Sequence, residues 1–444
     1  LLQTPFDYLD IKSLSLLPQE QLIETLRMRR FFLELFNHPL RIEHLKNANT
    51  KKFVAPGKVE SDAILHAVQN GTAVSIGDLG SSIEGSGKQR MSRKERYASG
   101  PFVKLGKQAR SIFVSSASPD VWNSAPAIAT MAASHCLAGV PRNGLTSSLE
   151  RQTDLAKEVF VWLDDMAEEM LKGRKDKQEV LNMWKANVCG TLETNAKKVM
   201  TRAQALYDIG VRSFRIYSPE PGTGALETVK VLRKEFGNDI EIWAGQVVDV
   251  KQAKDLEAAG ADGLFVGIGG GGRCITGVRS GLAIDWPELV FSLRGEINIP
   301  IIAEGGASDH IAVSLLLGAS GISVSRIVSG GTIESPGGTL YCVDAHGRMF
   351  KPYGGEASAR TKYLDGKLLP FDIPSFVEGE VTKAEMSYVK HVRPTLTYNL
   401  HLLTEDAILA LVFRGASDIQ ELQAINPSPL RLLSTSGDFQ RNTH

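Results

Sequence analysis

Residues 258–272 read Ala-Ala-Gly-Ala-Asp-Gly-Leu-Phe-Val-Gly-Ile-Gly-Gly-Gly-Gly, a helix end that turns directly into an apolar strand and then into a glycine-rich loop. A similar helix end, Leu317-Gly318-Ala319-Ser320-Gly321, precedes another apolar run further along the chain. Helices that pass straight into strands in this way are typical of βα units built around a parallel sheet. The two stretches therefore predict an α/β fold.

Short apolar runs alternate with amphipathic stretches from Ser111 to about Gly331. Eight successive βα units close a barrel, so we expect a TIM (β/α)8 barrel. Asp249 and Ser308 are expected to cap the helices that follow the fifth and seventh strands. The predicted strands are Ser111–Ser116, Leu137–Val140, Lys185–Cys189, Val211–Tyr217, Ile240–Ala244, Gly263–Val266, Ile299–Ala303 and Gly321–Ser325.

The rest of the chain is expected to be arranged around this barrel. Its N-terminal extension begins with a helix, Gln19–Phe36, and then becomes rich in glycine and basic residues. A second helix is predicted near the C-terminus, at Leu402–Phe413. The expected segments are the extension at 1–107, the barrel at 108–365, an active-site flap and C-terminal helix completing the barrel at 366–425, and a flexible tail at 426–444.

Charge and hydropathy exclude several classes of partner. Lys and Arg together number 50, as do Asp and Glu, so no net field attracts nucleic acid or an anionic membrane. No apolar run approaches the roughly 20 residues of a membrane span, and the first thirty residues mix charges throughout. We therefore expect a cytoplasmic protein. The basic run at 88–96 is interpreted as a solvated face or a subunit contact.

The four cysteines are widely spaced, without a CxxC pair or a nearby pattern of histidine ligands, so neither a metal site nor a disulfide framework is predicted. Cys136, Cys189 and Cys342 are interpreted as core or strand thiols. Cys274 differs because it follows the glycine run, where free backbone N–H groups can face an anion and favour a thiolate. It is the candidate nucleophile; the alternative is a surface turn with an incidental cysteine.

A candidate phosphate site follows the seventh predicted strand. Glu304 and two glycines lie between that strand and a helix, which directs N–H groups at an anion. The next unit ends in Ser325-Arg326, beside the same spot, and barrels often bind phosphate between these two loops. Glu304 is predicted to accept hydrogen bonds from ribose hydroxyls. As alternatives, the glycines only serve a tight turn, and Glu304 neutralises Arg326.

Together these segments resemble the IMP dehydrogenase and GMP reductase family, from Ser111 to about Arg360. The Cys274 loop is similar to the family's GxGxGSxCxTR loop, and Ile301–Ala307 to its strand carrying an acid and two glycines. The other resembling segments are Thr332–Gly338 (TxExPGE in the family), Arg348–Ser358 (KxYRGMGS), Ser115–Asp120 (SSPMD) and Gly139–Asn143 (the turn ending in His-Arg-Asn).

The resemblance implies an oxidoreductase that binds a purine 5′-monophosphate and NADPH or NAD, with K⁺ at the Cys274 loop and a homotetrameric assembly. The Cys274 thiolate would add to purine C2 beside Thr276, with Glu378 as an acid, although an ungapped alignment places Ser375 there. The implied substrate-binding residues are Ser116, Asn143, Gly271, Gly272, Arg273, Glu304, Gly305, Gly306, Ser325, Arg326, Tyr353, Gly355, Glu356 and Ala357. The implied cofactor-binding residues are Tyr217, Ser218, Glu220, Gly267 and Gly269.

Departures from the family pattern bear on the reaction. Glu356 stands where the family has a methionine, and a carboxylate there can pair with the N1–H and 2-amino group of guanine. Glu380 and Lys383 replace the Arg-Tyr pair with which dehydrogenases activate water, and the CBS insert is absent. These features favour reductive deamination of GMP or a related purine or deazapurine nucleotide. The alternatives are dehydrogenation of IMP and a nucleotide-binding protein without turnover.

Overall fold

The computed structural model describes residues 11–60, 74–76, 91–116, 118–217, 224–267, 284–353, 368–369, 373–374, 385–388, 394–432 and 435. Within these residues, eight parallel strands form the central sheet, and a bridge between Val114 and Leu137 joins its two edges. The predicted TIM barrel is therefore confirmed. Its strands, in spatial order, are β5 (Phe113–Ser115), β12 (Gly321–Val324), β11 (Ile301–Ala303), β10 (Gly263–Val266), β9 (Glu241–Val247), β8 (Ser213–Tyr217), β7 (Val188–Leu192) and β6 (Ala138–Val140).

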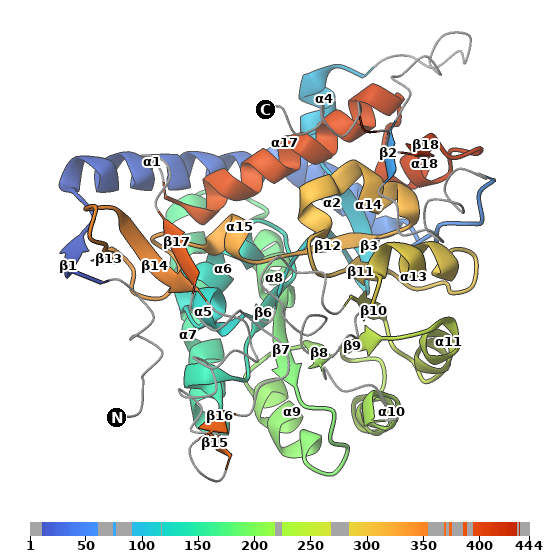
Figure 1. The fold of residues 1–444 in the computed structure, drawn as a ribbon, viewed down its shortest axis with the longest axis horizontal. Helices are drawn as coiled ribbons and strands as arrows, with labels where there is room; N and C mark the ends of the chain where they lie inside the picture. Colours follow the sequence, from blue (N-terminus) through green and yellow to red (C-terminus); the bar gives the residue numbers. More distant parts are fainter. Residues whose placement is uncertain are drawn as a thin grey trace.

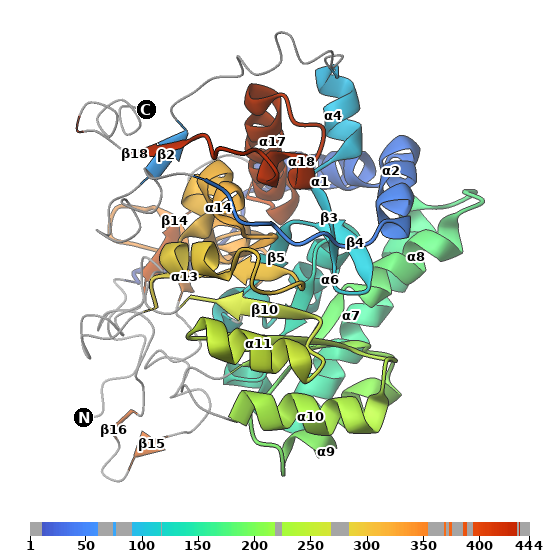
Figure 2. The ribbon, with the colours of Figure 1, turned by 90° about the vertical axis from the view of Figure 1, so that its right-hand side faces the viewer.

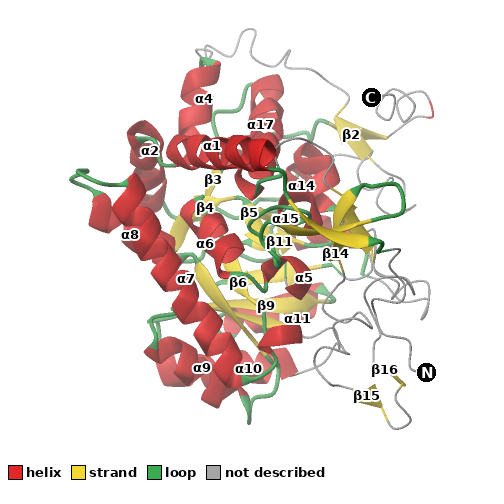
Figure 3. Ribbon diagram, turned by 90° about the vertical axis from the view of Figure 1, so that its left-hand side faces the viewer, coloured by secondary structure: helices red, strands yellow, loops and turns green. Residues whose placement is uncertain are grey.

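Helices cover the outside of the barrel and connect its strands (Figures 1 and 3). Asp249 caps its helix as predicted, because its carboxylate accepts a hydrogen bond from Gln252 N at 2.7 Å. The expectation for Ser308 is wrong, because a 3₁₀ turn, η4 (Ala307–His310), precedes the helix. The outer helices are α6 (Ala125–Ala133), α7 (Leu149–Met170), α8 (Lys177–Ala186), α9 (Val199–Asp208), α10 (Gly224–Phe236), α11 (Val250–Ala258), α13 (Trp286–Leu293), α14 (Ile311–Leu317) and α15 (Arg326–Ser329).

Six of the predicted strands begin one to three residues too early, and the third differs most. Lys185 belongs to α8, and β7 starts only at Val188. Trp184 explains the shift, because its indole is buried and donates a hydrogen bond to Asn37 Oδ1 at 3.0 Å. This anchor holds the last turn of α8 in place, so the strand starts after the turn at Asn187.

A hairpin closes the N-terminal end of the barrel. It consists of β3 (Phe102–Leu105) and β4 (Gln108–Ser111), and a Cβ added at Gly106 in its turn would lie 2.9 Å from Glu241 Oε1. Arg110, on β4, forms a buried ion pair with Glu241, the first residue of β9. The carboxyl ends of the strands, where barrel enzymes bind their ligands, face the opposite way.

Segments from both ends of the chain pack together on the barrel. Helices α1 (Gln19–Phe36) and α17 (Leu396–Arg414) lie side by side, and Phe32 stacks on His401 with ring centroids 4.4 Å apart (Figure 1). Nearby are α2 (Pro39–Thr50) and α4 (Arg93–Ser99) (Figure 2). The prediction of a solvated face or subunit contact is wrong for Arg96 on α4, which is buried and donates to Ala416 O.

A second sheet joins the N-terminal extension to the segment after the barrel. Its strands are antiparallel, in the order β1 (Ser13–Leu16), β13 (Leu340–Val343), β14 (Met349–Tyr353) and β17 (Glu385–Tyr388). A strand within the predicted tail, β18 (Leu430–Leu432), pairs with β2 (Val74–Ile76). Shorter elements are α5 (Pro119–Trp122), η3 (Gly144–Thr146), β15 (Leu368–Leu369), β16 (Ile373–Pro374) and α18 (Ile419–Gln423). Among the described helices, none has the length and apolar character needed to cross a bilayer.

Candidate active site

Four neighbouring strands bring predicted site residues together at the carboxyl end of the barrel. Val266 is in register with Ala303, and Val324 with Ser115. β12 connects the two pairs, because it lies between β11 and β5. The residues that follow these strands are Gly267, Glu304, Ser325 and Ser116, and they are therefore neighbours along one rim of the barrel.

The two glycines after Glu304 form a tight turn. Gly305 and Gly306 have φ values of 91° and 82°, a region that side chains other than glycine rarely adopt. Trp286 on α13 donates its indole N–H to Gly305 O at 2.8 Å, which fixes the orientation of this peptide. No side chain of the described residues caps η4, so its first N–H groups suit an anion.

Gly267, the first residue after β10, contacts the Glu304 turn. Its φ is 133°, and a Cβ at this position would lie 2.0 Å from Glu304 O. The backbone of Gly267 therefore touches that of Glu304 at the point where the chain leaves β10. This contact explains why the glycine-rich segment begins directly at the strand end.

We expect Gly267→Ala to lower the free energy of unfolding by about 1–3 kcal/mol, because an alanine is strained at this φ and collides with the neighbouring backbone. Affinity for the purine monophosphate that the sequence resemblance implies should also fall, since the collision displaces the Glu304 turn. Urea unfolding and calorimetric titration measure the two effects. Gly237→Ala is the matched control, because Gly237 also has a positive φ but has no atom within 4 Å of an added Cβ. Equal changes in stability and in affinity for the two variants would show that the contact with Glu304 O causes neither effect.

Glu304 is held by side chains from three other strands. Its Oε2 accepts hydrogen bonds from Arg215 Nη2, at 2.8 Å, and from Gln246 Nε2, while Ser323 Oγ donates to Oε1 at 3.0 Å. The alternative expectation, that Glu304 neutralises Arg326, is wrong: its ion pair is with Arg215. Arg326 is exposed at the start of α15.

Two hydroxyl groups meet at the carboxyl end of β12. Ser325 Oγ and Tyr353 Oη are 3.1 Å apart, so β14 brings its last residue to the barrel rim. Burial raises the pKa of the Tyr353 phenol, which therefore stays protonated and can donate a hydrogen bond. Ser116 Oγ accepts hydrogen bonds from Ser118 N and the Trp122 indole. Ser116 and Ser325 thus contribute hydroxyl groups to the same rim of the barrel as the Glu304 turn.

Two further predicted residues belong to the far side of the rim. Asn143 follows β6, is buried, and accepts hydrogen bonds from Thr146 through its carbonyl oxygen. Tyr217 is the last residue of β8, and its carbonyl accepts a hydrogen bond from Arg142 Nη2 at 3.2 Å. The strands β6 and β8 lie on either side of β7, away from the Glu304 turn.

Three of the four cysteines lie in the described part of the chain. Cys136 and Cys189 are buried, and burial raises the pKa of each thiol to about 12, which agrees with their interpretation as inert thiols. Cys342 is partly buried on β13. The remaining predicted site residues lie outside the described ranges: Ser218, Glu220, Gly269, Gly271, Gly272, Arg273, Cys274, Thr276, Gly355, Glu356, Ala357 and Glu378.

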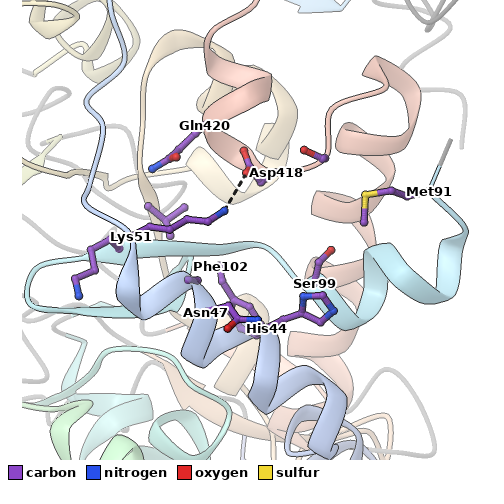
Figure 4. Close-up of a pocket in the computed structure, with 13 residues that line it drawn as sticks. His44, Asn47, Lys51, Met91, Ser99, Phe102, Asp418 and Gln420 are labelled. Atoms are coloured by element: carbon purple, nitrogen blue, oxygen red, sulfur yellow. Dashed lines mark ion pairs between the residues drawn. The ribbon is translucent and has the colours of Figure 1, made fainter. Parts of the chain in front are cut away.

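A pocket of about 230 Å³ lies elsewhere, beside the hairpin that closes the N-terminal end (Figure 4). Its walls come from α2, α4, β3 and the segment before α18. Lys51 and Asp418 form an ion pair of 3.9 Å across it. None of the predicted site residues lines this pocket, so it is separate from the strand-end site.

Comparisons with known proteins point to one family. A sequence model of the IMP dehydrogenase / GMP reductase domain matches residues 86–443. An inosine-5′-monophosphate dehydrogenase of Rhodopirellula baltica is 34% identical over 200 residues, 44% of this chain and 35% of that protein. Inosine-5′-monophosphate dehydrogenase 1 of Arabidopsis thaliana is 33% identical over 188 residues, 40% of this chain and 36% of that protein. A GMP reductase of Streptococcus pyogenes is 33% identical over 206 residues, 45% of this chain and 57% of that protein. The matches thus span about a third to somewhat over half of these relatives.

Proposed function

Because the chain belongs to the IMP dehydrogenase and GMP reductase family, we propose that it is an oxidoreductase that acts on a purine 5′-monophosphate with NADPH or NAD. The observation that carries the proposal is the rim shared by β10, β11, β12 and β5. The loop that contains Cys274 starts on the strand next to the Glu304 turn. A nucleotide bound by this turn would therefore lie beside the segment that carries the candidate nucleophile.

The phosphate and the ribose would be held by the neighbouring strand ends. Backbone N–H groups at Gly305 and Gly306 suit the phosphate, together with Ser325 and the glycine-rich loop up to Arg273. Glu304 would accept a ribose hydroxyl. Ser116, Asn143, Arg326 and the segment from Tyr353 to Ala357 would complete the pocket around the base.

The reaction would proceed by covalent catalysis. The Cys274 thiolate would add to purine C2 and make this carbon tetrahedral. In the reductase direction, Thr276 and Glu378 would deliver the proton with which the 2-amino group leaves as ammonia, and addition of hydride to C2 would then break the C–S bond and release the thiolate. A nicotinamide cofactor supplies or accepts the hydride at C2. Gly267 would contribute only backbone groups to the cofactor site, because the space that a side chain would take is filled by Glu304 O. Tyr217, Ser218, Glu220 and Gly269 would hold the cofactor, and K⁺ binding at the Cys274 loop and a homotetrameric assembly belong to the same proposal.

We favour the reductase direction, in which hydride enters C2 of GMP and ammonia leaves. Glu356 can pair with the N1–H and 2-amino group of guanine, and the flap lacks the Arg-Tyr pair that activates water in dehydrogenases. The relatives do not separate the two reactions, since both kinds are 33–34% identical to this chain. Dehydrogenation of IMP is therefore the second candidate.

Nicotinamide absorbance distinguishes these reactions. We expect the full chain to consume NADPH in the presence of GMP and to release ammonia in equal amount. Reduction of NAD⁺ with IMP, without reaction of GMP, would show a dehydrogenase instead. Binding of either nucleotide without any change in absorbance would show a protein that has kept the pocket and lost turnover.

A further inference from the structure

We propose that Arg215 is a positioning residue for the substrate: it holds Glu304 so that the carboxylate accepts one ribose hydroxyl and not two, next to the phosphate turn. This inference rests on the proposed function, because it takes a purine 5′-monophosphate as the ligand. It concerns one cluster, which consists of Arg215, Gln246, Glu304 and Ser323.

Arg215 reaches across the barrel interior. It lies on β8, whereas Glu304 follows β11, and β9 and β10 separate the two strands (Figure 1). The guanidinium lies over the ring of Phe265 with its carbon 3.8 Å from the ring centroid, and 3% of the side chain is exposed. Burying a guanidinium this deeply requires compensation, which the Glu304 carboxylate supplies in part.

The hydrogen bonding of Arg215 is incomplete within the described part of the chain, unlike that of Arg110, which is also buried. Arg110 makes five hydrogen bonds through its three nitrogen atoms, two of them to Glu241. Among the described residues, Arg215 makes one, to Glu304, while its Nε and Nη1 are buried without a partner there. Gln246 Oε1 beside it also has none. A pair serving stability alone would be expected to resemble Arg110, so the unsatisfied atoms indicate a functional constraint.

The acceptor capacity of Glu304 is nearly filled. A carboxylate offers roughly four lone-pair positions, two on each oxygen. Arg215 and Gln246 occupy both positions on Oε2, and Ser323 occupies one on Oε1. One position remains, on Oε1. The 2′- and 3′-hydroxyls of a ribose are two donors, so only one of them can bind this carboxylate.

Charge gives Arg215 a second effect. Glu304 directly precedes the proposed phosphate turn, so an uncompensated carboxylate would repel a phosphate dianion bound there. Arg215 offsets this charge from the more buried side of the cluster, because 3% of its side chain is exposed, against 17% of the Glu304 side chain. The carboxylate is thus the member of the cluster that a ligand can reach, and the arginine sets its orientation and net charge.

The first test uses the unmodified full chain and isothermal titration with GMP, 2′-deoxy-GMP and 3′-deoxy-GMP. We expect one deoxynucleotide to lose about 10- to 100-fold in affinity, as when a hydrogen bond to a charged group is removed, and the other to bind within about threefold of GMP. Tight binding of GMP with equal losses for both deoxynucleotides, or with no loss for either, overturns this inference alone. Failure of GMP and IMP to bind overturns the proposed function and this inference together.

The second test separates positioning from structural support. Arg215→Met should weaken binding of GMP by about 10-fold or more relative to guanosine, which lacks the phosphate, because Glu304 is then uncompensated. Adding Glu304→Gln to Arg215→Met should return the GMP-to-guanosine ratio toward its original value. Arg212→Met is the matched control, since Arg212 is exposed just before β8 and donates to Tyr207 O. Equal weakening of GMP and guanosine in Arg215→Met would mean that Arg215 only supports the fold.

Discussion

Cys274→Ala should abolish turnover and leave affinity for the purine monophosphate nearly unchanged. In the proposed reaction the sulfur forms the bond to purine C2, while the phosphate and the ribose are held by the separate rim at Glu304–Gly306 and Ser325. Removal of a nucleophile that acts in concert with its neighbours lowers turnover by on the order of 10⁴-fold or more. Turnover measured by nicotinamide absorbance and affinity measured by calorimetry test the two halves of this expectation independently.

The buried cysteines provide the control. Cys136→Ala and Cys189→Ala should keep turnover, because burial raises the pKa of both thiols to about 12 and leaves them protonated near neutral pH. In the unmodified chain, iodoacetamide should abolish turnover by alkylating Cys274, and bound nucleotide should slow this loss. An active Cys274→Ala protein would eliminate the covalent step, while the nucleotide site at the barrel rim would remain.

The barrel could be predicted because its strands obey a local rule. Each strand is a short apolar run bounded by helix-ending glycines or polar turns, so sequence alone locates all eight, and Gly263–Val266 is correct to the residue. The errors arise where the apolar pattern does not set the boundary of an element. Trp184 extends α8 because its indole bonds to Asn37, and the turn at Gly305-Gly306 is followed by a 3₁₀ turn before α14 begins.

The partners of Glu304 could not be found by matching motifs. Arg215 lies 89 residues earlier in the chain, and neither it nor Gln246 belongs to a segment that resembles the family's motifs. One signal was available: β8 reads Ser-Phe-Arg-Ile-Tyr, and a charge within a strand enclosed on both faces requires a buried partner. The identity of that partner depends on which strands face each other across the barrel, which the sequence of one strand does not specify.

Glu241→Met should lower the free energy of unfolding by about 3–5 kcal/mol, the range expected when one partner of a buried ion pair is removed. Arg110 is fully enclosed, and Glu241 is its only acidic partner among the described residues. Glu241 Oε1 also accepts a hydrogen bond from Lys107 N at 2.6 Å, in the turn of the closing hairpin. The substitution therefore leaves a buried cation at the N-terminal end of the barrel and releases the hairpin.

A double-mutant cycle in urea separates the charge from the packing. Arg110→Met/Glu241→Met should be less destabilised than the sum of its single variants, because no unpaired charge remains inside the barrel. Asp255→Ala breaks an exposed ion pair with Lys251 on α11 and should change stability little, since solvent screens that pair. Additive single effects would mean that Arg110 and Glu241 act only through packing and through their separate hydrogen bonds. A non-additive result would instead show that the ion pair itself stabilises the end of the barrel opposite the candidate active site.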